Sequence, residues 1–236
     1  MRERAAFLDF DGTLSKGFIS MSFLEFLHAG GFYSDALYNR QMKIYDDYNE
    51  GKLPYVGWCK QWGLLWAEGF KGKGQSEVSD YASNFFEGFK HNVYSESFGL
   101  IDTLKRYGYR PLLISVGAYE VLSYAANALG ITKVYATKLE IKNGTYTGKI
   151  ELGMHIPDGK ARVLKNLSNE FDMVDSFAFG DSVSDKQMFD LVGIPIVLNA
   201  SRELKNMAKE KGWKSFDSKD VIAGIISLIQ QPKNTT

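Results

Sequence analysis

The residues best suited to chemistry lie in the segment Asp9-Phe10-Asp11-Gly12-Thr13. It directly follows the apolar run 5–8, which we expect to be a buried strand ended by Gly12. Side chains two residues apart project to the same side of a strand, so the two carboxylates should lie together where it ends. Open α/β sheets bind ligands at the carboxyl ends of their strands. The segment therefore predicts a paired-acid site, although Asp, Gly and Thr are also ordinary turn residues.

Two carboxylates this close repel each other unless something offsets their charge. They either share a proton or hold a cation. With a hard cation such as Mg²⁺ in place, one of the two can act as a nucleophile while the other handles protons. The pair of carboxylates alone does not distinguish an active site from an ordinary turn. The distinction needs further residues elsewhere in the chain.

A hydroxyl group follows a second predicted strand. Ser115 ends the expected strand 110–115, and Val116-Gly117 reads as a tight turn with free backbone N–H groups before a helix at 119–129. A hydroxyl and free N–H groups together suit a phosphate oxygen. A serine that caps the next helix is an equally good interpretation.

A lysine lies where a helix should begin. Lys160 is in the first turn of the helix expected up to about residue 169. A positive charge at that end opposes the helix dipole, so a bound anion would explain it. A solvated side chain is the alternative.

Further acids follow a third predicted strand, 174–180. Asp181 comes at its tip, and Asp185 lies near the start of the next helix. Helix capping by Ser182 or Ser184 accounts for part of this pattern. It does not account for Asp181 at the strand end.

The elements that must position these groups form two patterns. From residue 92 onward, strands alternate with helices, and Asn143-Gly144 predicts a hairpin. This favours a three-layer, Rossmann-like α/β core with a mainly parallel sheet. Residues 17–91 contain no convincing strand and predict four helices. We therefore expect a discontinuous core, 1–16 plus 92–236, with a helical cap domain over 17–91.

Two stretches of the helical segment stand out. Trp58, Trp62 and Trp66 recur on one helix face, which favours core packing, with pocket lining as the alternative. The stretch 69–76 resembles a phosphate-binding P-loop, but it lacks the final lysine and a preceding strand. It is interpreted as a flexible basic loop.

Composition excludes several classes. The 236 residues carry 28 basic and 28 acidic side chains, so nothing favours nucleic acid or a charged membrane surface. Cys59 is the only cysteine, which fits a reducing compartment. There is no signal-peptide pattern and no run long enough to cross a bilayer, so a cytoplasmic location is expected. Residues 231–236 read as a polar tail.

The order of these motifs matters more than any one of them. Asp-x-Asp-Gly-Thr, strand-Ser, Lys at a helix start and Gly-Asp-Ser-x-x-Asp resemble the haloacid dehalogenase (HAD) superfamily of phosphohydrolases. The helical segment resembles the type-1 cap of subfamily I. Within it, the chain looks most similar to the phosphoserine-phosphatase-like branch. The resemblance covers the core from end to end, and the cap only in placement and helicity.

The resemblance implies a role for each acid. Asp9 would be the nucleophile that forms an aspartyl-phosphate. Asp11 would be the general acid and then the general base. Asp9, the backbone carbonyl of Asp11 and Asp181 would hold Mg²⁺. Asp185 would orient a water or Lys160.

The same resemblance assigns the remaining groups. Ser115, Gly117 and Lys160 would bind the phosphoryl oxygens, and Lys160 would also offset the negative charge gathered there. Thr13 would steady the loop by hydrogen bonding.

Some positions depart from phosphoserine phosphatases. No acid stands between Ser15 and Glu25 to hold a substrate ammonium, and serines at 182 and 184 replace the usual Gly and Asn. Both differences count against phosphoserine. Four basic cap residues would suit a larger or more anionic ester: Arg40, Lys43, Lys52 and Lys60.

We therefore expect a Mg²⁺-dependent phosphomonoester hydrolase acting on a small phosphorylated metabolite, with no nucleic-acid or membrane partner. A phosphotransferase or phosphomutase on the same fold is the alternative. A non-catalytic phospholigand-binding module is less favoured, because no member of the expected residue set is missing. Substrate identity and oligomeric state stay open.

Overall fold

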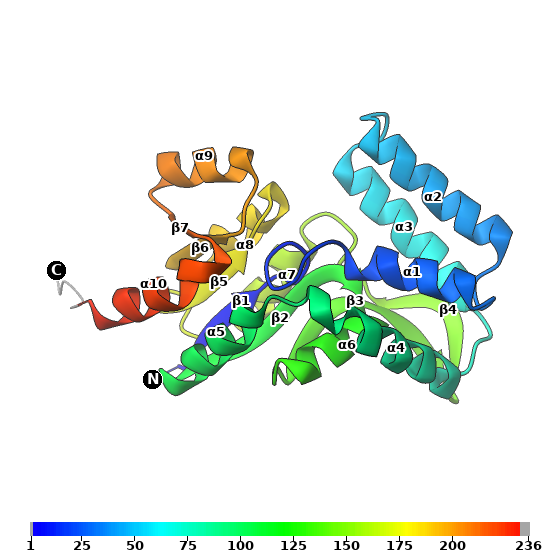
Figure 1. Cartoon of the computed structure of the whole chain (residues 1–236), viewed down its shortest axis with the longest axis horizontal. Helices are drawn as coiled ribbons and strands as arrows, with labels where there is room; N and C mark the ends of the chain where they lie inside the picture. Colours follow the sequence, from blue (N-terminus) through cyan, green and yellow to red (C-terminus); the bar gives the residue numbers. More distant parts are fainter. Residues whose placement is uncertain (1, 232–236) are drawn as a thin grey trace.

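Seven strands form one sheet in the computed structural model, which describes residues 2–231. Their order across the sheet is β4-β3-β2-β1-β5-β6-β7, and only the β3–β4 pair is antiparallel (Figure 1). The strands are β1 (Arg4–Leu8), β2 (Tyr109–Ala118), β3 (Lys133–Lys142), β4 (Thr145–Leu152), β5 (Phe177–Gly180), β6 (Ile194–Leu198) and β7 (Lys214–Phe216). This is the mainly parallel sheet that the sequence predicts.

Strand β1 is the central strand that leads directly to the predicted site. It lies between β2 and β5, with Phe7 in register with Leu112 on one side and Ala178 on the other. Ala5 to Leu8 are completely buried, as expected for an apolar central strand. Because its neighbours run parallel, the residues that follow β1, β2 and β5 meet at one edge of the sheet.

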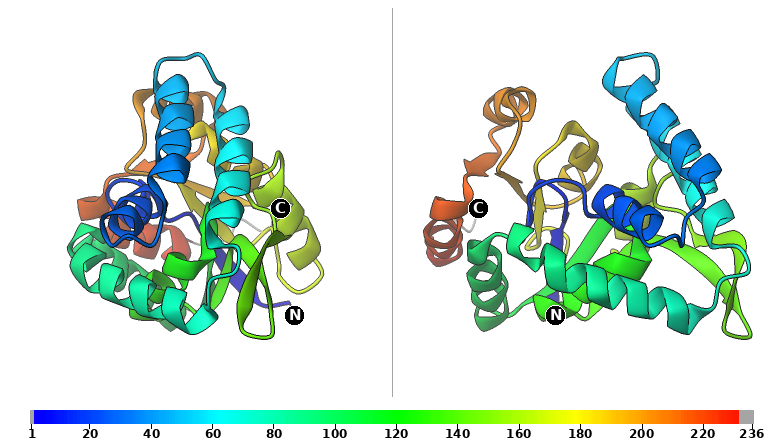
Figure 2. Two further views of the ribbon diagram at one scale, coloured as in Figure 1. Left: turned by 90° about the vertical axis from the view of Figure 1, so that its right-hand side faces the viewer. Right: turned by 45° about the vertical axis from the view of Figure 1, so that its right-hand side comes forward.

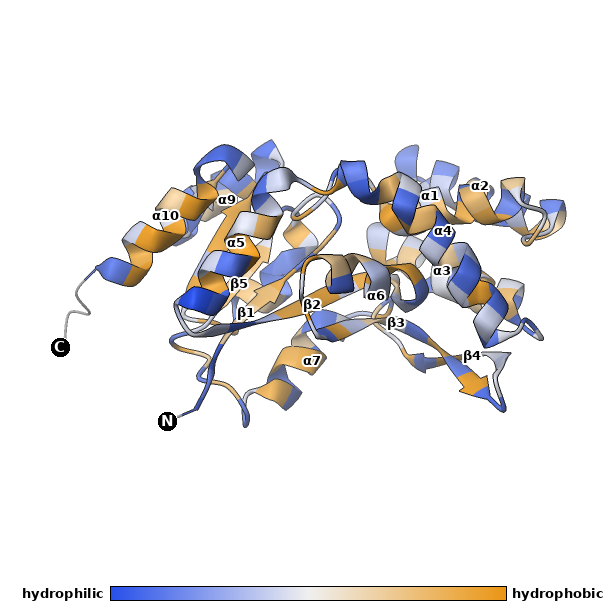
Figure 3. Cartoon of the chain, turned by 60° about the horizontal axis from the view of Figure 1, so that its bottom comes forward, coloured by the Kyte–Doolittle hydropathy of each residue, from blue (hydrophilic) through white to orange (hydrophobic). Residues whose placement is uncertain are grey.

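Helices cover both faces of the sheet, which gives the predicted three layers. One face packs under α5 (Ser95–Arg106), α6 (Tyr119–Ala128) and α10 (Ser218–Gln230). The other packs on α7 (Gly159–Leu167), α8 (Lys186–Phe189) and α9 (Arg202–Lys211). Figure 3 shows the apolar strands between the layers of α5 and α7. Alternate β1 side chains belong to opposite cores, as the two-residue period of a strand requires.

Four helices intervene between β1 and α5. They are α1 (Ile19–Ala29), α2 (Asp35–Asn49), α3 (Tyr55–Phe70) and α4 (Gln75–Phe89). They do not stand apart from the core: α4 lies along α6, and α3 packs against β4 (Figures 1 and 2). We keep 17–91 as the proposed extent of this insert. None of the helices within residues 2–231 is long and apolar enough to cross a membrane.

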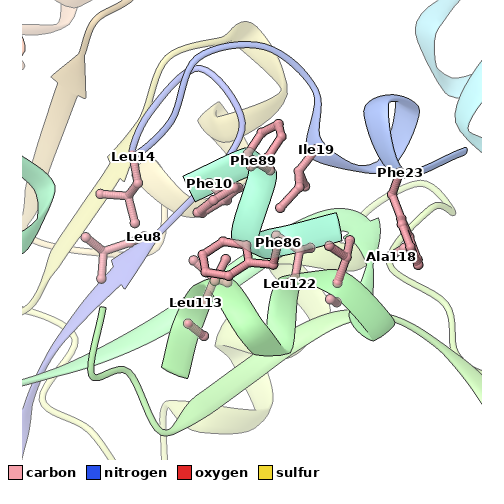
Figure 4. Close-up of a cluster of buried hydrophobic side chains, with 14 of the residues drawn as sticks. Leu8, Phe10, Leu14, Ile19, Phe23, Phe86, Phe89, Leu113, Ala118 and Leu122 are labelled. Atoms are coloured by element: carbon pink, nitrogen blue, oxygen red, sulfur yellow. The ribbon is translucent and has the colours of Figure 1, made fainter. Parts of the chain in front are cut away.

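One apolar core joins the insert to the sheet. Phe23 and Phe86 from the insert meet Leu122 of α6 and Leu113 of β2 in the cluster of Figure 4. Trp66 of α3 is fully buried in the insert. Its indole N–H donates to a carboxyl oxygen of Glu120 in α6, 3.3 Å away. Burial raises the pKa of Glu120 to about 7, although the Trp66 hydrogen bond acts in the opposite direction.

The structure corrects the turn expected at Val116-Gly117. β2 continues through it to Ala118, with a register irregularity after Ile114. The reason is that side-chain hydroxyls accept the backbone N–H groups there. Gly117 donates to Ser115 Oγ at 3.1 Å, and Ala118 donates to Ser20 Oγ at 2.8 Å.

Three other local expectations also change. The sequence predicts one strand at 133–137 and a hairpin from Lys138 onward, whereas β3 runs without a break from its parallel pairing with β2 into the hairpin. The strand expected at 174–180 begins only at Phe177, and Val174 is 75% exposed. The loop at 69–76 is not free: Gly72 and Gln75 donate backbone hydrogen bonds to Tyr146 and Gly144. Of the predicted polar tail, residues 232–236 lie outside the described residues.

Candidate active site

The carboxylates that follow β1 and β5 come together as the parallel pairing dictates. Asp9 continues the sheet beyond β1 by donating its backbone N–H to Phe179 O at 3.0 Å. Its side chain is buried, and Asp181 follows β5 directly. Carboxylate oxygens of Asp9, Asp181 and Asp185 lie within 4.8 Å of one another. The sheet thus unites acids that are more than 170 positions apart in the sequence.

The loop after Asp9 is shaped to admit Asp181. Gly12 has a φ of +77°, and a Cβ at this position would overlap the Asp181 carboxylate. Thr13 Oγ1 donates to Asp181 Oδ1 at 3.2 Å. The Gly-Thr pair therefore closes the loop over the second acid, which places Thr13 where the sequence predicted a steadying contact.

Two buried carboxylates explain why Lys160 lies at the start of α7. Its Nζ lies 2.9 Å from Asp9 Oδ1 and 2.5 Å from Asp185 Oδ1, and all three side chains are buried. Burial alone would lower the pKa of Lys160. The neighbouring carboxylates of Asp185 and Asp9 outweigh burial, so its pKa rises above the ordinary value and the ammonium stays charged.

Asp185 holds other groups in position with both of its oxygens. Oδ1 accepts from Lys160, while Oδ2 accepts the backbone N–H groups of Asp181 at 3.1 Å and Ser182 at 3.0 Å. Gly180 makes this possible, because a Cβ there would collide with the Asp185 carboxylate. With its oxygens engaged in this way, Asp185 fits the orienting role expected of it better than a ligand role.

Asp11 has a different environment from the other acids. Its Oδ1 accepts the backbone N–H of Ile19, the first residue of α1, at 2.8 Å. Burial raises the pKa of Asp11 to about 7, against the Ile19 hydrogen bond and the charge of Lys160. The side chain of Asp11 lies outside the three-carboxylate cluster. A protonated carboxyl at neutral pH is the state that a general acid needs.

Ser115 and Gly117 reach the same cavity as the acids. Ser115 is buried near the end of β2, beside β1, so its hydroxyl approaches the site from the neighbouring strand. In this structure the Gly117 N–H is held by Ser115 Oγ rather than free.

The oxygen donors fit a hard divalent cation. Burial raises the pKa of Asp9 well above its usual range, and repulsion from Asp185 and Asp181 adds to this despite Lys160. Burial and Asp185 also raise the pKa of Asp181, to about 6. Acids that destabilise one another in this way are stabilised by a cation, and carboxylate oxygens suit Mg²⁺. Asp9 and Asp181 are the side chains available to hold it.

A cavity of about 560 Å³ opens above these groups. Its bottom is formed by Asp9, Asp11, Lys160 and Asp181, and Asp185 does not line the cavity but pairs with Lys160. We call these five residues the acidic floor. One side is formed by Tyr55, Trp58 and Trp62 of α3, which we call the insert wall.

The three tryptophans of α3 therefore divide between core packing and pocket lining. Trp66 is core, whereas Trp58 and Trp62 line the cavity. The basic cap residues do not: Arg40 pairs with Glu68 at 2.9 Å and Lys43 with Asp47 at 3.2 Å, and none of the four basic residues is part of the cavity lining. The expectation of a larger or more anionic ester therefore loses the four residues on which it rested.

Sequence reasoning missed several site residues. Asn199, after β6, donates from Nδ2 to the Thr13 carbonyl at 3.1 Å and accepts the Ser218 N–H at 2.8 Å. Its φ of +54° places it in the left-handed region, which asparagine tolerates. His155 and Gln187 also line the cavity. An Asn at a strand end was a usable signal for Asn199, whereas nothing in the local pattern marks the other two.

Comparisons with known proteins agree with this geometry. A family model described as haloacid dehalogenase-like hydrolase matches residues 6–190. A probable phosphatase of Mycobacterium tuberculosis is 31% identical over 123 residues, 51% of this chain and 42% of that protein. A phosphoserine phosphatase of Lactococcus lactis is 34% identical over 109 residues, 45% of this chain and 50% of that protein.

The matched segments thus span about half of these curated relatives or less. A crystal structure of a protein of unknown function from Bordetella pertussis superimposes with a TM-score of 0.80 at 24% identity. That match covers 92% of this chain and all of the other, which supports the fold alone.

Proposed function

Because this chain belongs to the haloacid dehalogenase-like hydrolase family, we propose that it is a Mg²⁺-dependent phosphomonoester hydrolase of the phosphoserine-phosphatase-like branch. We propose an aspartyl-phosphate intermediate and a small phosphorylated metabolite as substrate. The observation that carries the proposal is the meeting of Asp9, Asp181 and Lys160 beyond the central strand, with Asp11 beside them but outside the carboxylate cluster. The phosphatase names of two relatives support it.

The first step assigns Asp9 and Asp11 separate tasks. An Asp9 carboxylate oxygen attacks phosphorus, so that an O–P bond forms to Asp9 while the ester O–P bond breaks. The leaving oxygen takes a proton from Asp11, whose carboxyl is held in place by the Ile19 N–H. Lys160 lies against Asp9 and fixes the attacking carboxylate.

The second step reverses the proton traffic. Asp11, now ionised, takes a proton from a water molecule that attacks phosphorus, and the bond to Asp9 breaks. Phosphate leaves and both acids return to their starting states. Ser115 and Lys160 would hold phosphoryl oxygens throughout, because both line the cavity beside Asp9.

The metal would be held by Asp9, Asp181 and the main-chain carbonyl of Asp11. Bound there, Mg²⁺ supplies positive charge that neutralises phosphoryl oxygens and carboxylates together. The chain prepares for it through Gly12 and Thr13, which let Asp181 approach the Asp9 loop.

The test is phosphate release from a broad panel of phosphomonoesters with Mg²⁺ or with a chelator. We expect release only with Mg²⁺, and loss of release in Asp9→Asn. Asp190→Asn is the matched control, because Asp190 pairs with Lys186 on the surface. Wild-type turnover in Asp9→Asn would remove Asp9 as nucleophile. Adding glycerol as an acceptor and analysing products separates hydrolysis from phosphotransfer.

A further inference from the structure

Exposed apolar side chains gather at the mouth of the active-site cavity. Eight large apolar side chains are exposed in the described part of the chain, and four of them line this cavity. The four are Phe18 before α1, Val56 in α3, Ile156 between β4 and α7, and Val183 beyond β5. Apolar surface that four separate segments bring to one opening marks a place where a ligand is bound.

The inner surface has the same character. The insert wall presents aromatic rings, and Tyr48 stacks on Trp58 with ring centroids 4.8 Å apart. Rings that are already packed against each other form a rigid face, which suits a flat or aliphatic body. Met21 and Met154 add adaptable apolar surface to the lining.

Charge is distributed very unevenly over the cavity. Among residues 2–231, its lining contains one lysine, Lys160, and no arginine. Lys160 is already paired with Asp9 and Asp185. Away from the acidic floor, the only charged lining residue in the described part of the chain is Glu203, which is exposed on α9. A leaving group with a carboxylate or a second phosphate would lose water here without gaining a cationic partner.

We propose that the enzyme selects phosphomonoesters of uncharged alcohols that carry an aromatic or otherwise apolar body. The phosphoryl group lies on the acidic floor, and the body of the alcohol lies between the insert wall and the apolar mouth. This inference rests on the proposed function. It also agrees with one departure from phosphoserine phosphatases, because no acid stands between Ser15 and Glu25 to hold the ammonium of an amino-acid substrate.

The test compares two alkyl esters whose alcohols differ in charge and apolar surface. With Mg²⁺, kcat/KM is measured for 2-phenylethyl phosphate and for phosphoserine, and the first is expected to exceed the second at least about tenfold, the effect of burying one apolar ring. Acetyl phosphate, whose leaving group is small, reports the phosphoryl chemistry alone. The ratio of kcat/KM for 2-phenylethyl phosphate to kcat/KM for phosphoserine does not depend on the fraction of folded protein.

Two variants on α3 test whether the cavity mouth determines the substrate preference. Val56 and Leu64 are similarly exposed, at 47% and 57%, but only Val56 lines the cavity. Val56→Lys gives a carboxylate a partner at the mouth and removes apolar surface. We expect it to lower the ratio of 2-phenylethyl phosphate to phosphoserine at least about fivefold, a rim-charge effect of about 1 kcal/mol. Leu64→Lys should leave the ratio within twofold.

The outcomes separate the two proposals. Turnover of acetyl phosphate with phosphoserine equal to or better than 2-phenylethyl phosphate would overturn this inference and leave the proposed function standing. Equal shifts in Val56→Lys and Leu64→Lys would also overturn it, because the mouth would then not be the selecting surface. Absence of Mg²⁺-dependent turnover for every ester would overturn the proposed function, and this inference with it.

Discussion

The acidic floor and the insert wall line the same cavity but differ in how their polar groups are paired. On the floor, Lys160 and Asp185 engage each other, Asp9 and two backbone N–H groups. On the other sides, Trp58 Nε1, His155 Nδ1 and Gln187 Oε1 are buried without a hydrogen-bond partner. A paired polar network fixes one geometry, whereas unpaired groups cost free energy and hold nothing in place. The floor is suited to a constant phosphoryl group, and the rest of the lining, which includes the insert wall, is suited to a leaving group that varies.

The comparison predicts that floor variants lose activity on all substrates. After the complete loss expected for Asp9→Asn, the largest fall in kcat is expected for Asp11→Asn. An amide at this position cannot protonate the leaving oxygen, so kcat for alkyl phosphates should fall about 10²- to 10⁴-fold. With 4-nitrophenyl phosphate the leaving group needs no proton. Rapid mixing should therefore show a burst of about one equivalent of nitrophenolate per enzyme, followed by slow turnover.

An Asp11→Asn variant without this burst, and with equal losses on both kinds of ester, would show that Asp11 does not act as the acid in the first step. Asp46→Asn on α2, which is not part of the cavity lining, is the control.

Lys160→Met should come next in size. It removes one positively charged contact to the phosphoryl group, which lowers kcat about 10²- to 10³-fold for every ester. It also leaves Asp9 and Asp185 buried without their cation, which should destabilise the fold by about 3–5 kcal/mol. Denaturant unfolding measures the second effect.

Lys186→Met is the matched control for Lys160→Met, because its partner Asp190 is on the surface and the pair should contribute less than about 1 kcal/mol. Equal destabilisation in both variants would contradict the buried-pair interpretation.

Glu120 tests the junction between the insert and the core. Its pKa is raised from 4.5 to about 7, so the folded state binds a proton that the unfolded state has lost between these values. Stability from this group is therefore present at low pH and falls as pH rises through 7, by up to about 3 kcal/mol. Glu120→Gln keeps an acceptor for Trp66 and should remove this dependence.

Unfolding free energies of wild type and Glu120→Gln at pH 5 and pH 8 check this expectation. The two proteins should be similar at pH 5, and the variant should be the more stable at pH 8. A constant difference across pH would exclude Glu120 as the source.

The smallest effect is expected at Asn199, which contacts the loop after Asp9 from outside the acidic floor. Asn199→Ala places a residue with a Cβ and no side-chain polar group at φ +54°, which should cost about 1–2 kcal/mol. It also frees the Thr13 carbonyl, so kcat should fall several-fold. Asn143→Ala is matched in backbone strain, with φ +50°, but lies in the hairpin. It should lose stability without losing kcat. Equal kcat values in the two variants would show that Asn199 does not support the active-site loop.

Much of the core was predictable because local rules and the sheet agree. The apolar run before Asp9 becomes a central strand, and the acids after β1 and β5 meet because parallel neighbours end at the same edge. Spacing alone placed Asp9 and Asp11 near each other, and the resemblance to the HAD superfamily added Asp181 to them. Their roles stay a proposal, since proximity does not establish which acid attacks phosphorus.

The parts that the sequence did not reveal depend on long-range contacts. Gly117 is a residue typical of turns, yet β2 continues through it. The reason is that the hydroxyls of Ser115 and Ser20 accept the backbone N–H groups of Gly117 and Ala118. Trp58 and Trp66 repeat at the same helical spacing, but only the arrangement of α2, α6 and β4 around α3 decides which one meets the cavity. A one-dimensional period cannot carry that information.

Helix α3 has one consequence for how substrates enter. Its carboxyl end is anchored, since Phe70 packs on Tyr146 of β4 at 5.5 Å and the next residues bond to the same strand. Its amino end, with Tyr55, Val56 and Trp58, borders the cavity. The helix of 16 residues is about 24 Å long, so its amino end lies far from the end that is held by β4. Because of this length, a tilt of about 5° at the held end would displace the residues at the cavity mouth by about 2 Å.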